Sequence, residues 1–184
     1  MSVQSQKTDH LKKMIENQQV AVDPADPDRF QMRIARDGTW YHQGSPIRRI
    51  ALAKLFSTVL RLEEDGNYWL VTPVERGRIE VEDVPFTAVE MTVEGDGRNQ
   101  VLCFRTNFDD IVRVNAKHPL RMTKNDETGE PSPYITVRNN LEALITRPTF
   151  YELVDLAETQ WDGDEGQLGI WSGGVLFDLG STVE

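Results

Sequence analysis

The sequence predicts an α+β protein with a duplicated core of two modules, each a curved antiparallel sheet covered by one helix. Short alternating apolar segments recur along the chain, and turn dipeptides such as Asp37-Gly38 and Asn139-Asn140 separate them, as is typical of β-hairpins. Residues 45–64 and 147–160 instead carry apolar residues at helical spacing. The order hairpin, helix, hairpin occurs in residues 30–72 and again in residues 134–180. We therefore expect these two segments to superpose as one repeated motif.

The first residues are predicted to lie outside the folded core. The chain has 184 residues, a length that suits one domain or two small ones. Residues 1–28 are polar and end in two Asp-Pro steps, which favour an extended connector over a helix. We expect a flexible segment over residues 1–28, an N-terminal module over residues 29–95 and a C-terminal module over residues 96–184.

The N-terminal module is predicted to begin with a hairpin over residues 30–47. Residues 45–64 follow as a helix, with Ser45 as its N-cap and Pro46 at the first helical position. Residues 65–86 are then expected to form a hairpin followed by a third strand. Pro73 ends the first strand of that hairpin or kinks it at an edge, because proline cannot donate a hydrogen bond to a neighbouring strand.

The C-terminal module is predicted to contain two strands within residues 99–114 and a polar connector over residues 117–133. A hairpin turns at Asn139-Asn140, and residues 147–160 form a helix. An acidic loop over residues 161–167 leads to a closing hairpin that turns at Gly173-Gly174.

The charge balance narrows the class of partner. Lys and Arg total 20 against 30 Asp and Glu, a formal net charge of −10, which disfavours binding to a nucleic-acid polymer or an anionic membrane. No apolar run approaches the roughly 20 residues that span a bilayer, and the first residues lack the apolar core of a signal peptide. A cytoplasmic location is the expectation.

Few residues have the pattern of a nucleophile or of a metal ligand. Cys103 is the single cysteine and lies in the apolar segment VLCF, so we expect an inert core thiol. Ser172 lies in WSGG, but Ile170 stands where a nucleophile elbow needs its first glycine. Neither a Walker A sequence nor a GxGxxG motif is present.

Four carboxylates lie close together in the sequence: Glu75, Glu80, Glu82 and Asp83. They could serve as a general acid/base pair or as oxygen ligands of a divalent metal. A solvated strand face with a turn is the favoured interpretation, since short local motifs are weak evidence. Glu80 and Glu82 are expected on the face opposite Ile79 and Val81.

Arg105, Arg138 and Arg147 each lie in or beside an apolar segment. A guanidinium in such surroundings needs an anionic partner. Glu75 or Glu82 could supply it, and so could the phosphate or carboxylate of a ligand, which the arginine fork binds through two hydrogen bonds. Both interpretations stay open. We expect Glu75 or Glu82 within reach of Arg105 or Arg138.

The segments DGTWYHQGSPI, YWLVTPVERGRIEVEDVPF, FRTN, PYITVR, LEALITRPTFYEL and GIWSGG resemble the bacterial family called domain of unknown function 1285. The resemblance covers residues 30–180. It implies a duplicated core whose C-terminal module is superficially like a pleckstrin-homology fold. It also implies a nucleotide-like ligand between the modules and a role in signalling, although no activity is established for the family.

The leading hypothesis is a non-enzymatic protein that binds a small anionic, nucleotide-like molecule between the repeated modules and acts in signal transduction. The alternatives are a carboxylate-based, divalent-metal-assisted hydrolase and a protein-interaction adaptor. The sequence identifies no cofactor and no specific protein partner. The residues predicted to bind the ligand are Thr72, Glu75, Glu82, Asp83, Arg105, Tyr134, Arg138 and Arg147.

Overall fold

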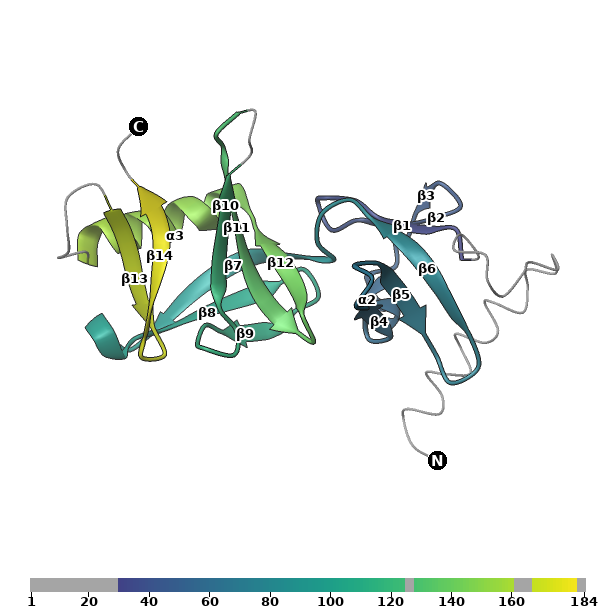
Figure 1. Cartoon of the computed structure of the whole chain (residues 1–184), viewed down its shortest axis with the longest axis horizontal. Helices are drawn as coiled ribbons and strands as arrows, with labels where there is room; N and C mark the ends of the chain where they lie inside the picture. Colours follow the sequence, from purple (N-terminus) through teal and green to yellow (C-terminus); the bar gives the residue numbers. More distant parts are fainter. Residues whose placement is uncertain (1–29, 125–127, 161–166, 182–184) are drawn as a thin grey trace. The chain divides into compact units, whose positions relative to one another are not determined.

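The computed structural model describes residues 30–124, 128–160 and 167–181 (Figure 1). The flexible segment predicted over residues 1–28 and most of the predicted acidic loop lie outside the described residues. The chain divides into two compact units, Met1–Asp83 and Val84–Glu184. This division lies earlier than the boundary expected after residue 95, because the strand Phe86–Glu94 pairs with strands of the second unit.

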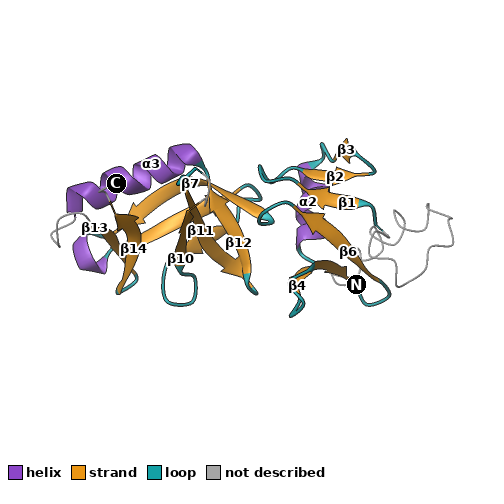
Figure 2. Ribbon diagram, turned by 45° about the horizontal axis from the view of Figure 1, so that its top comes forward, coloured by secondary structure: helices purple, strands orange, loops and turns teal. Residues whose placement is uncertain are grey.

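The N-terminal unit contains a six-stranded sheet in the order β3-β2-β1-β6-β5-β4. Every neighbouring pair is antiparallel except the central pair of β1 and β6, which is parallel. Figure 2 shows the helix α2 beside this sheet. The bounds are β1 Met32–Ile34, β2 Trp40–His42, β3 Ser45–Pro46, α2 Ile50–Ser57, β4 Leu60–Leu62, β5 Tyr68–Val71 and β6 Arg76–Val81.

The core of this unit lies on the sheet face that packs against α2. Residues that alternate along the strands are buried there, including Ile34, Leu70 and Ile79, as the period of a strand requires. The Trp40 ring stacks on Phe56 of α2 with ring centroids 6.2 Å apart. The predicted hairpin at Asp37-Gly38 and the strand that ends before Pro73 are both confirmed.

The predicted helix over residues 45–64 is wrong at both ends. Ser45–Pro46 forms the edge strand β3, paired with Tyr41 and His42, where a missing proline N–H faces no partner strand. The helix begins only at Ile50, whose side chain is 65% exposed, and Leu60–Leu62 already belongs to β4. Pairing with β2 and β5 therefore outweighed the helical pattern at these positions.

The C-terminal unit contains a second six-stranded sheet, in the order β10-β11-β12-β7-β8-β9, and a separate hairpin of β13 and β14. Helix α3 packs against β7 and β13 (Figure 2). The predicted polar connector is partly wrong, because β10 pairs with β11 over five residue pairs. The bounds are β7 Phe86–Glu94, β8 Val101–Thr106, β9 Ile111–Arg113, β10 Leu120–Lys124, β11 Pro131–Arg138, β12 Leu141–Ile145, α3 Arg147–Gln160, β13 Gln167–Ser172 and β14 Val175–Ser181, with a 3-10 turn η1 at Gly97–Asn99.

The two six-stranded sheets share one topology. In each sheet the first strand pairs in parallel with the sixth, β1 with β6 and β7 with β12, and the second and third strands extend the sheet on one side and the fifth and fourth on the other. The duplicated core is therefore confirmed. The predicted order of hairpin, helix and hairpin also occurs in both segments. However, the strands that correspond in the two sheets are β1–β6 and β7–β12. The hairpin of β13 and β14 is not equivalent to β4 and β5, because it forms a sheet of its own whereas β4 and β5 belong to the six-stranded sheet.

The hairpin of β13 and β14 is attached to the second sheet through buried polar groups. The Ser172 hydroxyl accepts a hydrogen bond from the Leu102 N–H (2.9 Å) and donates one to the Val114 carbonyl (2.8 Å). The buried Gln100 amide donates to the Trp171 carbonyl at 2.9 Å, and the Gly173 N–H donates to the Gln100 carbonyl at 3.0 Å. Ser172 thus connects the hairpin to two backbone groups of the second sheet, one in β8 and one in Val114, the residue after β9.

Replacing Gly173 by alanine should destabilise the protein more than replacing Gly174. Both glycines have positive φ, 56° and 76°, so each alanine carries left-handed strain of about 1–2 kcal/mol. At Gly173 a Cβ would lie 2.9 Å from the Val114 carbonyl oxygen, whereas at Gly174 a Cβ would enter open space. We expect urea denaturation to show about 1–3 kcal/mol more loss for Gly173→Ala; equal losses would mean that the close approach is not a constraint.

Candidate functional site

The predicted site residues are divided between the two units. Thr72, Glu75, Glu82 and Asp83 lie in or beside β5 and β6 of the N-terminal unit, and Arg105, Tyr134, Arg138 and Arg147 lie in the C-terminal unit. The prediction that Glu75 or Glu82 lies within reach of Arg105 or Arg138 joins residues of different units and stays a prediction. Each group is described within its own unit.

Thr72 and Glu75 close the turn between β5 and β6. The Thr72 N–H donates to the Glu75 carbonyl at 2.8 Å. The Thr72 hydroxyl donates to the same carbonyl and accepts from the Glu75 N–H, both at 3.0 Å. Thr72 therefore has a defined structural role in the turn, which does not require a ligand.

Glu82 and Asp83 are held by arginines of the first strand and the turn after it. Arg33 donates to one Glu82 carboxylate oxygen, and the Arg36 N–H donates to the other at 2.9 Å. The Arg36 Nε lies 3.3 Å from an Asp83 carboxylate oxygen. These contacts depend on the parallel pairing of β1 and β6, which continues through the bond from the Glu82 N–H to the Ile34 carbonyl (3.0 Å). Local patterns in the sequence do not reveal such a pairing.

The turn between β8 and β9, residues 106–110, is called the TNFDD turn here. The Thr106 hydroxyl accepts hydrogen bonds from the N–H groups of Phe108 (3.2 Å) and Asp110 (3.1 Å). Asn107 is hydrogen-bonded to the backbone of Thr87 on β7 in both directions, at 2.9 and 3.2 Å. The buried Phe108 ring meets the Phe86 ring edge-on, with centroids 6.0 Å apart. The turn is therefore anchored by its backbone and by one aromatic side chain.

Two of the predicted arginines each bind a carboxylate of the TNFDD turn. The Arg105 guanidinium binds Glu90 at 2.6 Å and Asp109 at 3.0 Å. The hydrogen bonds that Arg105 donates, first to Glu90 and second to Asp109, raise the pKa of Arg105 above its usual value. Arg138, at the end of β11, binds Asp110 at 2.8 Å, and its guanidinium lies 4.8 Å from the centroid of the Phe86 ring.

The sequence prediction missed Glu90, Asp109 and Asp110, which supply the carboxylates of this cluster. The repeated acid in FDD was visible in the sequence. Its pairing with Arg138 was not, because β8 and β11 are brought together only by the parallel contact of β7 and β12.

The remaining two predicted residues make separate contacts. Tyr134 is buried, and the Arg121 guanidinium lies 4.3 Å from the centroid of its ring. Arg121 also binds both carboxylate oxygens of Glu142, at 2.9 and 2.6 Å. Arg147 begins α3 and forms an ion pair with Glu130. Tyr134 and Arg147 are thus not members of the cluster at the TNFDD turn.

The nucleophile candidates of the sequence have structural surroundings. Burial first, and the neighbouring Glu94 carboxylate second, raise the pKa of the Cys103 thiol. Ser172 is fully buried and hydrogen-bonded to backbone groups. Within residues 30–124, 128–160 and 167–181, no group of three or more His, Cys, Asp or Glu side chains has a geometry that could hold a metal ion. No helix in these ranges combines the length and the apolar character that a bilayer crossing requires.

Comparison with known proteins gives one consistent result. Residues 21–84 match the model of the N-terminal domain of a family described as a domain of unknown function, DUF1285, and residues 85–179 match the model of its C-terminal domain. No curated protein matches the chain.

Two solved structures are similar to this chain. A DUF1285 family protein from Silicibacter pomeroyi DSS-3 is 43% identical, with a TM-score of 0.75 over 88% of this chain and 92% of that one. A DUF1285 family protein from Shewanella baltica OS155 is 25% identical, with a TM-score of 0.55 over 72% of this chain and 94% of that one.

Cys103 should react slowly with a thiol reagent in the native protein. Its raised pKa lowers the thiolate fraction at neutral pH, and burial restricts access to the sulfur. Labelling with a chromogenic disulfide reagent should accelerate as the pH is raised, because the thiolate fraction grows, and should be complete at once in denaturant, with Cys103→Ala as the control. Immediate labelling of the native protein at neutral pH would contradict this.

Proposed function

The chain belongs to the DUF1285 family, and from this membership and the geometry of the TNFDD turn we propose that it is a non-enzymatic protein that binds a small anionic, nucleotide-like molecule. The observation that carries the proposal is the presentation of two guanidiniums, Arg105 and Arg138, by one anchored turn. Phosphate and carboxylate oxygens are the groups that such a pair recognises best.

The arginines are oriented before any ligand arrives. Arg138 lies over the Phe86 ring and its side chain is 31% exposed. Arg105 is held from two sides by Glu90 and Asp109, and its side chain is 39% exposed. A guanidinium that is already fixed loses less conformational entropy on binding than a free one. Both side chains remain accessible enough to contact a ligand.

The carboxylates of the cluster can be exchanged for those of a ligand at low cost. The Asp109 side chain is 74% exposed, and exposed ion pairs contribute only about 0–1 kcal/mol. Asp109 also has a positive φ of 62°, an uncommon conformation for a residue other than glycine. A phosphate that displaces Asp109 therefore gives up a weak ion pair and gains hydrogen bonds to Arg105. With three carboxylates and two guanidiniums, the cluster has a net negative charge. It would repel an anion that displaced none of the carboxylates.

Several features favour binding without catalysis. The candidate nucleophiles Cys103 and Ser172 are buried. Glu82 and Asp83 each form an ion pair with an arginine, which occupies carboxylate oxygens that a general base must present to its substrate. We propose that the protein acts in signal transduction in this limited sense: an anion bound and not consumed would shift the populations of conformers that a partner distinguishes.

A thermal-shift panel of nucleoside mono-, di- and triphosphates, pyrophosphate and citrate tests the proposal. A ligand that binds only the native state stabilises it by about 2.7 kcal/mol at a free concentration of about 100 times Kd, so a true ligand should raise Tm by several degrees. Arg138→Lys and Arg105→Lys keep the charge but lose the planar fork. Each should weaken binding about ten- to hundredfold, as expected for a lost charged hydrogen bond.

Arg113→Lys is the matched control, because Arg113 forms a cross-strand ion pair with Glu94 at 2.6 Å on the same sheet but does not contact the TNFDD turn. It should bind the ligand like the wild type. A Tm that none of the compounds raises would contradict the proposed ligand class. Equal loss of binding in Arg113→Lys and Arg138→Lys would remove the TNFDD turn as the site.

A further inference from the structure

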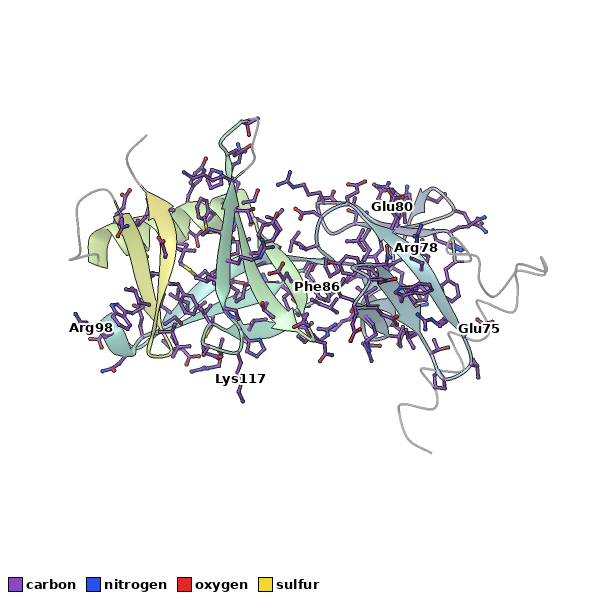
Figure 3. All side chains as sticks on the ribbon, viewed as in Figure 1. Glu75, Arg78, Glu80, Phe86, Arg98 and Lys117 are labelled. Atoms are coloured by element: carbon purple, nitrogen blue, oxygen red, sulfur yellow. The ribbon has the colours of Figure 1, made fainter. Side chains whose placement is uncertain are left out.

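The N-terminal sheet presents a second face, opposite the one that packs against α2. The cross-strand registers Arg61↔Trp69↔Arg78 and Tyr41↔Arg33↔Glu80 place these side chains together on that face, since paired residues of neighbouring strands point to the same side. The buried core residues Leu60, Leu70 and Ile79 occupy the alternate positions. We call this surface the Trp69 face; Figure 3 labels Arg78 and Glu80 on β6.

Two arginines of the Trp69 face are neutralised within it. Arg33 forms an ion pair with Glu82, and its guanidinium lies 4.3 Å from the centroid of the Tyr41 ring. Arg76 binds Glu63 at 2.8 Å, and its guanidinium lies 4.3 Å from the centroid of the Trp69 ring. These contacts fix the two aromatic rings against the sheet.

The two arginines that flank Trp69 in register lack a carboxylate within ion-pair distance among the described residues. Arg61 donates instead to the carbonyls of Thr58 (3.2 Å) and Leu60 (2.7 Å). Arg78, partly buried on β6, forms no ion pair with any residue that the structure describes. The C-terminal sheet differs, because there Arg105 binds a carboxylate of the neighbouring strand β7, and Arg113 and Arg121 each bind a carboxylate two strands away.

We propose that the Trp69 face binds an acidic segment of a partner protein. Tryptophan, tyrosine and arginine are the residues most enriched at the energetic centres of protein interfaces, and they occupy this face together. Arg61 and Arg78 lie on strands separated by β5, hence about 10 Å apart at the backbone. In a segment of polyproline II conformation, two carboxylates three residues apart lie on the same side and about 9 Å from each other. The partner therefore needs paired acids and an apolar group that contacts Trp69.

The same contacts argue against a nucleotide or a nucleic-acid strand as the occupant. Arg76 covers one face of the Trp69 ring, so a base cannot stack there. A nucleic-acid strand gains affinity from many phosphate contacts. Among the described residues, this face offers only two guanidiniums without a carboxylate partner, on a chain of net charge −10.

Glu80 allows a test in which two substitutions on β6 have opposite expected effects on binding. It is exposed, follows Arg78 by two residues on the same strand and forms no ion pair with any described residue. It should repel an acidic partner that binds Arg78. Glu80→Gln is expected to tighten binding, while Arg78→Gln weakens it.

The experiment is fluorescence anisotropy with a fluorescein-labelled peptide that carries glutamate pairs three residues apart and one leucine. A peptide with glutamine in place of glutamate is the control. The wild-type protein should bind the acidic peptide with an affinity that falls as salt is added. Arg78→Gln should lose about fivefold or more, the factor of a 1 kcal/mol contact at an interface centre, and Glu80→Gln should gain.

Arg121→Gln is the matched control variant, because Arg121 also lies over an aromatic ring, that of Tyr134, and is neutralised by Glu142. Arg121→Gln should bind the peptide like the wild type. Arg105→Lys should do so as well, and this result would show that peptide binding does not involve the TNFDD turn. The proposal is overturned if Arg78→Gln binds as tightly as Arg121→Gln. It is also overturned if oligothymidylate or ATP binds the Trp69 face more tightly than the peptide, or if sedimentation shows self-association that Arg78→Gln abolishes.

Discussion

Each six-stranded sheet depends on the parallel contact between its first and its last strand. Parallel neighbours cannot be joined by a tight turn, so in each unit the chain must pass from one edge of the sheet to the other before it returns to the centre. In the N-terminal unit α2 lies in that connection, between β3 and β4, whereas in the C-terminal unit β9 is followed by β10 with no helix of the described residues between them. The strands so joined carry fully buried core residues, such as Ile34 and Phe86.

This parallel contact brings the residues of both candidate sites together. Glu82 meets Arg33 because β1 and β6 lie side by side. Arg138 reaches Asp110 and the Phe86 ring because β12 brings the end of β11 next to β7 and its hairpin partner β8. The same architecture, used twice, thus places arginines against acids that are distant in the sequence. Loss of the central pairing would separate both sets of partners.

The two sheets use their polar faces differently. On the C-terminal sheet, Arg105, Arg113 and Arg121 each bind a carboxylate of another strand, so these charges are neutralised within the unit. Exposed pairs of this kind add little stability but can exchange their carboxylate for a ligand anion. On the N-terminal sheet, Arg61 and Arg78 flank Trp69 without a carboxylate partner among the described residues. The two proposals are therefore compatible: the C-terminal unit would bind a small anion, and the N-terminal unit would bind an acidic protein segment.

What the sequence determined by itself was local. The turn at Asn139-Asn140, where both residues have positive φ, the helix over residues 147–160 and the burial of Cys103 follow from residue types and spacing, because turn chemistry and periodicity act over a few residues. Only the tertiary structure decided that Ser45 and Pro46 form an edge strand, that residues 120–124 pair with β11, and that Arg138 binds Asp110. Contacts between distant strands leave no periodic signal in either strand, and the energy of forming them is set by the sheet as a whole.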